Sequence, residues 1–195
     1  MNEDLTWINQ ISLLSCKHRV ALLKALTQEK EMEIRSIVEI GVYRGNTSKL
    51  FRLFFPEATL YLIDPWKIYD AYQTVDARPI STEQSDYENA YENVKQLFPN
   101  DPKVHILRKS SLEAAPEVPN NLDLVFIDGN HSYPFVKQDI QTWLPKVRDG
   151  GILAGHDYDP IHFPGVTQAV DELFGYNDVL LGPDRTWVKW KEALR

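Results

Sequence analysis

The sequence lacks several features that define large classes of proteins. Its 195 residues include a single cysteine, Cys16, which excludes an internal disulfide and is typical of a reducing compartment. The net charge of −7 argues against nucleic acid or an anionic membrane surface as a partner. No apolar run approaches the roughly 18 residues of a membrane span, and the acidic first residues are unlike a secretion signal. We therefore expect a cytoplasmic protein in which Cys16 packs in the core.

Two phosphate-binding patterns are also missing, the Gly-x-Gly-x-x-Gly dinucleotide fingerprint and the Walker A motif. Instead, residues 38–48 read VEIGVYRGNTS, with Gly41 and Gly45 where an expected strand turns into a helix. Glycines let the backbone turn tightly there and let a ligand come close to it. Because Glu39 would repel a phosphate, we expect a ligand that carries a positive charge or hydroxyl groups.

Short β-rich runs alternate with helix-length segments, which predicts a parallel sheet with crossover helices. The runs cover residues 36–40, 59–63, 103–107, 123–127 and 151–155. Helices are expected over residues 47–55 and 166–174, and a third is expected to start after Ser132 and end before Pro145. The chain length fits one domain covering residues 1–195.

The two ends and one internal segment depart from this alternation. Residues 1–30 predict a leading helix, with Trp7, Ile11, Leu14, Leu22, Leu23 and Leu26 as apolar positions, at the sheet edge or over the site. Residues 178–181 and 186–190, joined by a Gly-Pro-Asp turn, predict a C-terminal antiparallel hairpin. Residues 65–89 predict a long connection, which we expect to be a lid or an acceptor wall. In it, Trp66, Tyr69 and Tyr72 either stack on an acceptor or pack the connection down.

A candidate cofactor site follows from the first two expected strands. Asp64 ends the second strand about 20 residues after Gly41, the place where a carboxylate binds a ribose diol in folds of this type. Together with Glu39, it suits a ligand that has a ribose and a positive centre. S-adenosylmethionine fits this description.

A second group of polar residues follows the fourth and fifth expected strands. Asp128 and His131 come after the fourth strand, and His156 and Asp157 after the fifth. If these strands are neighbours, the four side chains meet at the carboxyl edge of the sheet, where open α/β proteins bind ligands. Carboxylates and imidazoles are suitable ligands for a divalent cation.

Four segments in this order resemble the class I S-adenosylmethionine-dependent methyltransferases, in the group of small O-methyltransferases with a site like that of catechol methyltransferase. They are VEIGVYRGNTS at 38–48, LIDPW at 62–66, DLVFIDGNHSY at 123–133 and DGGILAGHDY at 149–158. The resemblance spans roughly residues 36–190. It implies a Rossmann-like three-layer α/β sandwich whose seven-stranded, mostly parallel sheet has an antiparallel last strand, in agreement with the hairpin.

The resemblance also implies a set of site residues. Those expected at the cofactor are Glu39, Gly41 and Gly45 at its methionine part, Asp64 at the ribose, Ser110 and Ser111 at the adenine, and Asp128. Those expected at a divalent cation such as Mg²⁺ are Asp128, His156 and Asp157. We assign the general base to His131, beside Asp128, because a neutral histidine can take a proton near pH 7.

The predicted reaction is O-methylation of a hydroxyl on a small molecule or a glycan, assisted by a metal ion. Two alternatives stay open: an NAD(P)-dependent oxidoreductase on a related sheet, and a binding protein that has kept the fold without catalysis. The sequence also leaves open the acceptor, the requirement for a metal and the formation of a homo-oligomer.

Overall fold

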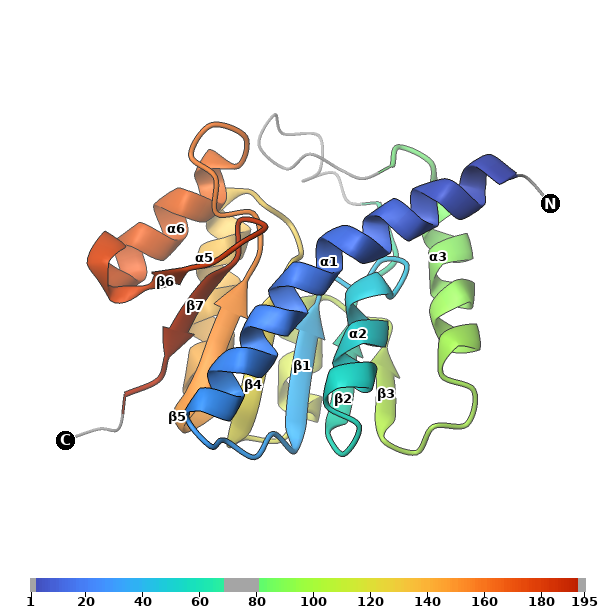
Figure 1. Ribbon diagram of the computed structural model, residues 1–195. Coiled ribbons are helices and arrows are strands. Elements are labelled where there is room, and N and C mark those ends of the chain that lie inside the picture. Colours follow the sequence, from blue (N-terminus) through green and yellow to red (C-terminus); the bar gives the residue numbers. More distant parts are fainter. Residues whose placement is uncertain (1–2, 69–80, 193–195) are drawn as a thin grey trace.

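A computed structural model describes residues 3–68 and 81–192. In this part of the chain seven strands form one sheet in the order β3-β2-β1-β4-β5-β7-β6 (Figure 1). They are β1 Ser36–Ile40, β2 Thr59–Ile63, β3 Val104–Leu107, β4 Leu122–Ile127, β5 Val147–Gly155, β6 Leu180–Leu181 and β7 Trp187–Trp190. Strands β1 to β5 are parallel, and β7 pairs antiparallel with both β5 and β6. The predicted Rossmann-like sheet and its C-terminal hairpin are confirmed.

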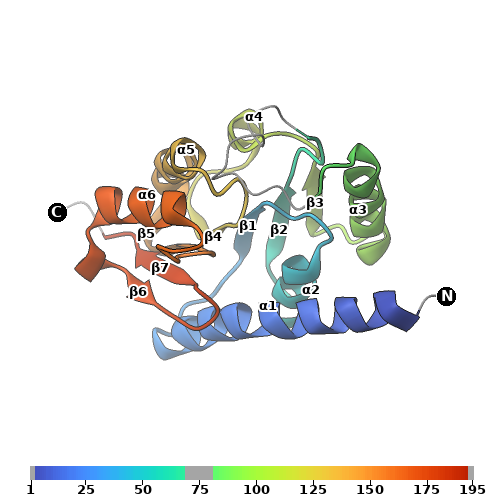
Figure 2. The same cartoon turned by 90° about the horizontal axis from the view of Figure 1, so that it is seen from above.

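Helices cover both faces of the sheet, as the view from above shows (Figure 2). The α-helices are α1 Glu3–Glu29, α2 Asn46–Phe54, α3 Gln84–Leu97, α4 Ser111–Ala114, α5 Tyr133–Trp143 and α6 Pro164–Phe174, with short 3-10 turns at Ala115–Glu117, Leu144–Lys146 and Tyr176–Asp178. In the described part of the chain, no helix is both long and apolar enough to cross a membrane.

Alternate residues of the central strands pack in two separate cores, because successive side chains of a strand point to opposite faces of the sheet. Leu124 and Phe126 of β4 pack in the core with residues of α1, α2 and α3. Val125 and Ile127 of the same strand pack in the core with residues of α4, α5 and α6. The two cores fix the sheet between its helix layers and bring the carboxyl ends of β1, β2, β4 and β5 to one edge.

The leading helix is confirmed. Its residues Cys16 and Arg19 line a cavity at the carboxyl edge of the sheet, which agrees with the predicted position over the site, but the helix does not lie at the sheet edge. Instead, α1 lies across one face of the sheet beside α2 (Figures 1 and 2). Cys16 and Leu23 belong to this helix and are buried in the core, as expected of its apolar positions. The side chains of Trp7, Ile11 and Leu14 lie outside the described residues.

The long connection is shorter than predicted, because residues 84–89 belong to α3. Tyr87, Ala90 and Val94 form the buried face of this helix. That spacing of three and four residues is a helical pattern, which the sequence analysis overlooked among the polar residues around it. Tyr69 and Tyr72 lie outside the described residues, so their predicted roles stay predictions.

Candidate functional site

A cavity of about 560 Å³ opens at the carboxyl edge of the sheet. Its lining comes from the ends of β1, β2, β4 and β5 and from α1, α4 and α5, and includes Glu39, Gly41, Asp64, Ser110, Ser111, Asp128, His131, His156 and Asp157. The strand order reverses between β1 and β4, and ligands of open α/β sheets bind at such a switch point. The structure therefore brings nearly all the predicted site residues to one cavity of a size typical for ligands.

Glu39 lies near the end of β1 with only 1% of its surface exposed. The Ser48 hydroxyl, in the first turn of α2, donates a hydrogen bond to its carboxyl oxygen Oε2. Burial raises the pKa of Glu39 from 4.5 to about 8, because the Ser48 hydrogen bond offsets only part of the lost hydration. A positive ligand group beside Glu39 would favour its charged form.

Asp64 ends β2 and is held by backbone amides. Its Oδ2 accepts the N–H groups of Val42 and Tyr43 at 3.0 and 2.9 Å, and its Oδ1 accepts that of Trp66 at 2.6 Å. Burial raises the pKa of Asp64 against the effect of these three hydrogen bonds. Since an ionised carboxylate can accept about four hydrogen bonds, one position remains for a ligand hydroxyl.

The two glycines of the turn are required by the packing of the fold. Both have a positive φ, +85° at Gly41 and +75° at Gly45. A Cβ on Gly41 would lie 2.0 Å from the backbone oxygen of Asp128, and one on Gly45 would lie 2.8 Å from Leu97. Gly41 lines the cavity, whereas Gly45 lies behind the turn against α3. The spacing of these glycines therefore reflects strand and helix packing at least as much as ligand access.

Ser110 and Ser111 reach the cavity at the start of α4. Ser110 caps this helix, since its Oγ accepts the N–H of Glu113 at 3.4 Å and the Glu113 carboxylate accepts its N–H at 3.0 Å. The Oγ of Ser111 accepts a hydrogen bond from Trp143 Nε1 at 2.7 Å. Both serines are thus fixed in place by the fold itself.

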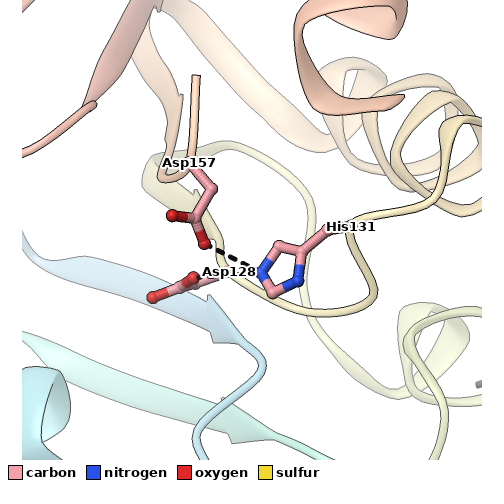
Figure 3. A group of neighbouring side chains, drawn as sticks. All are labelled: Asp128, His131 and Asp157. Atoms are coloured by element: carbon pink, nitrogen blue, oxygen red, sulfur yellow. Dashed lines mark ion pairs between the residues drawn. The ribbon is translucent and has the colours of Figure 1, made fainter. Parts of the chain in front are cut away.

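The residues after β4 and β5 form what we call the acid–histidine cluster: Asp128, His131, His156 and Asp157. His131 Nε2 lies 2.9 Å from Asp157 Oδ2 and 3.8 Å from Asp128 Oδ1 (Figure 3). His156 approaches the same two carboxylates through Nδ1, at 3.1 Å from Asp157 and 3.4 Å from Asp128. Asp157 has a left-handed backbone with φ +59°, an uncommon conformation that turns its carboxylate toward the two rings.

The cluster fits a bound cation in two respects. Asp128, His131 and Asp157 each offer a ligand atom, and these atoms lie within 4.8 Å of one another. Both ring nitrogens of His131 and Nε2 of His156 are buried without a hydrogen-bond partner among the described residues. His131 Nε2 is therefore close to a carboxylate but not aligned with it, as expected when both point toward a common third atom.

The charges of the cluster balance one another. Although burial opposes it, the two aspartates raise the pKa of His131 to about 9 and that of His156 to about 11. In return, and again against burial, the histidines hold the pKa of Asp128 and of Asp157 below the ordinary value of 3.8. Protonated rings thus supply the positive charge that a metal ion would otherwise bring to these carboxylates.

Two residues at this site were missed by the sequence analysis. Arg19 of α1 contacts Asp128, and Asp184 of the turn between β6 and β7 contacts both Arg19 and His156. Arg19 shares the buried face of α1 with Cys16, Val20 and Leu23, and a charge at helical spacing on an apolar face was the available signal. Asp184 gave no such signal, because aspartate is ordinary in a Gly-Pro-Asp turn.

Trp66 packs the connection after β2 and does not line the cavity. Its ring is fully buried against Tyr91, with the centroids 4.9 Å apart, and its Nε1 donates to the backbone oxygen of Tyr43. The aromatic residues that line the cavity are Tyr43, Tyr87, Phe135 and Phe163 instead.

The sequence matches a known protein family. The sequence model of a family described as a methyltransferase domain covers residues 38–158 of this chain. That range includes all the predicted site residues and leaves out Arg19 and Asp184. Two regions that complete the site, α1 and the hairpin, thus lie beyond the matched range.

Solved structures of methyltransferases share the fold. The O-methyltransferase NovP superimposes with a TM-score of 0.67 at 19% identity, covering 93% of this chain and 80% of that one. The O-methyltransferase TomG from Streptomyces achromogenes, solved in complex with SAM, gives a TM-score of 0.56 at 19% identity, covering 88% of this chain and 79% of that one. At such identities the likeness concerns the fold alone.

One curated relative is protein R132 of Acanthamoeba polyphaga mimivirus. It is 25% identical over 158 residues, which cover 78% of this chain and 65% of that protein. The chain therefore matches less than two thirds of the length of this relative.

Proposed function

Because the chain belongs to the methyltransferase-domain family, we propose that it transfers a methyl group from S-adenosylmethionine to a hydroxyl oxygen of a small molecule or a glycan. The single observation that carries this proposal is the cavity at the switch point of the sheet. One side of it presents Glu39 and Asp64, and the other presents the acid–histidine cluster. A cofactor and an acceptor can therefore meet within one site.

The first side suits the cofactor. When bound, S-adenosylmethionine supplies an activated methyl group on a sulfonium centre, and its ribose offers two hydroxyls. We assign the ribose to Asp64, which keeps one acceptor position, and the positively charged methionine part to Glu39. Gly41 keeps the β1 turn close to β4, and Ser110 and Ser111 form the wall assigned to the adenine. Methyl transfer is an in-line displacement, so the main task of these residues is positioning.

The second side suits a divalent cation. We assign Asp128, Asp157 and His131 as its ligands, because their ligand atoms converge. When bound, such an ion lowers the pKa of an acceptor hydroxyl. This assignment changes the predicted role of His131, since one nitrogen cannot both bind an ion and accept a proton.

His156 then becomes the candidate general base. It was predicted as a metal ligand, and the residue lines the cavity. Its Nε2 is buried 3.5 Å from Asp184 Oδ2 and has no hydrogen-bond partner among the described residues. With the carboxylate charge taken up by an ion, this ring would be neutral and able to accept the acceptor's proton. The two histidines thus exchange the roles that the sequence suggested.

The proposal is tested by calorimetry with S-adenosylhomocysteine, the demethylated product, and with NADH. We expect the product to bind and NADH not to bind. Binding of NADH without binding of the product would favour the oxidoreductase alternative and overturn the proposal. A protein that binds the product but never transfers a labelled methyl group to a panel of catechols, phenols and sugars would instead favour the non-catalytic alternative.

A further inference from the structure

Arg19 enters the acid–histidine cluster from α1, far from the strands that carry the cluster. Its Nη1 donates to Asp128 Oδ2 at 2.7 Å, and only 7% of its side-chain surface is exposed. The same carboxylate presents its other oxygen, Oδ1, to His131 and His156. The two oxygens of Asp128 therefore face different partners.

Asp184 holds the arginine from the opposite side. Arg19 Nε donates to Asp184 Oδ2 at 2.9 Å, and the same oxygen lies 3.5 Å from His156 Nε2. The planar guanidinium is thus fixed between a carboxylate of the cluster and one from the hairpin turn. A guanidinium presents its N–H groups at fixed angles, so this arrangement sets the orientation of both carboxylates.

The arrangement joins the two ends of the chain. Arg19 and Asp184 are 165 residues apart and both lie outside residues 38–158, which the family model matches. Each packs on a different side of the sheet edge, α1 against one face and the hairpin beyond β5 (Figure 1). Arg19 and Asp128 line the cavity, and Asp184 contacts Arg19 from the hairpin turn.

We propose that Arg19 and Asp184 are positioning residues that fix Oδ2 of Asp128 and thereby aim Oδ1 at the ion and the acceptor. This inference rests on the proposed function, since it assigns a purpose to the orientation of Asp128. The competing explanation is that Arg19 only balances the negative charge of the cluster. The two explanations differ because balance needs a positive charge, whereas positioning needs the guanidinium shape.

The test replaces the guanidinium of Arg19 with a group of another shape that carries the same charge. In Arg19→Lys, one ammonium cannot make both contacts at the same angles, so we expect Mn²⁺ to bind about 10-fold more weakly in the presence of saturating S-adenosylhomocysteine, a loss typical of changes to residues that orient metal ligands. Asp184→Asn should have a similar effect. The double variant should bind Mn²⁺ as weakly as Arg19→Lys alone, because both residues act through Asp128. Calorimetry with MnCl₂ gives these affinities.

The matched control is Arg52→Lys, since Arg52 of α2 is also partly buried and paired with an aspartate, Asp101, away from the cavity. It should leave the affinity for Mn²⁺ unchanged. Unchanged affinity in Arg19→Lys, or effects of the two single variants that simply add, would overturn the inference.

A crystal structure of Arg19→Lys gives a second readout that does not depend on a metal. We expect the Asp128 carboxylate to turn away from its wild-type orientation, and an unchanged orientation would contradict the inference. If the wild-type protein binds the cofactor product but not Mn²⁺, the metal part of the proposed function fails and this structure alone decides the role of Arg19.

Discussion

Glu39 is a buried carboxylic acid near the end of β1, and Asp128 is a partly buried one after the neighbouring strand β4, yet their environments differ sharply. Glu39 has one hydroxyl partner, and burial raises its pKa to about 8. Asp128 faces Arg19 and two histidines, which hold its pKa well below 3.8 in spite of burial. Burial alone therefore does not decide the charge of a carboxyl group at this edge; the partners do.

The same contrast separates the two sides of the cavity. On the cofactor side, Asp64 is satisfied by nearby backbone amides, so the side is shaped before any ligand arrives. In the acid–histidine cluster, ring nitrogens are buried without hydrogen-bond partners among the described residues. We interpret the first side as a preformed binding surface and the second as a group of charges arranged for a cation.

The largest expected effect comes from a change confined to the acid–histidine cluster. Asp157→Ala, or excess chelator on the wild-type protein, should lower turnover roughly 1,000-fold, equivalent to about 4 kcal/mol. The affinity for S-adenosylhomocysteine should change no more than about twofold, because Asp157 is assigned to the ion and not to the cofactor. Methyl-transfer assays and calorimetry measure the two quantities. Full activity in excess chelator would remove the metal from the mechanism.

The next largest effect is expected from a change on the cofactor side of the cavity. Asp64→Ala removes the acceptor assigned to the ribose and leaves three backbone N–H groups without their partner, so binding of S-adenosylhomocysteine should weaken about 100-fold, or about 2.7 kcal/mol. Calorimetry measures this loss.

Asp123→Ala is the matched control for Asp64→Ala. Asp123 is a buried carboxylate at the opposite edge of the sheet, where it accepts the backbone N–H groups of Arg35 and Ser36. This variant should also lose stability but keep its affinity for the product. Equal loss of affinity in both variants would show that Asp64 acts only through the fold.

The smallest effect sharpens the comparison of Glu39 with Asp128. The folded protein holds the Glu39 proton up to about pH 8, whereas an ordinary glutamate releases it near 4.5, so the contribution of Glu39 to stability is complete at low pH and is lost as the pH rises toward 8. Asp128, Arg19 and Asp64 are the charges that surround this group.

Between pH 6.5 and 7.5, the free energy of unfolding of the wild type should therefore fall by up to about 1.4 kcal/mol relative to Glu39→Gln, which carries no titrating group at this position. Urea denaturation of both proteins at the two pH values measures this difference. A constant difference between the two proteins would mean that Glu39 is already ionised at pH 6.5.

Much of the fold could be predicted because its signals are local. The strands ending at Ile40, Ile63 and Ile127 are apolar runs bounded by turn residues, and the helix before Pro145 has a clear apolar spacing. The missed helix α3 carries only three buried residues among many polar ones, so its pattern was weak. Because this helix begins at Gln84, the connection after β2 is shorter than predicted.

By itself, the sequence determined the sheet, the hairpin and the set of acids and histidines at the carboxyl edge, because parallel strands bring the residues that follow them to one place. Only the tertiary structure decided how those residues are paired. It showed that Gly45 serves packing, that His131 and His156 both approach the carboxylates of Asp128 and Asp157, and that Arg19 and Asp184 contact this cluster. These contacts join residues far apart in the chain, and no local pattern specifies the distance or the angle at which such side chains meet.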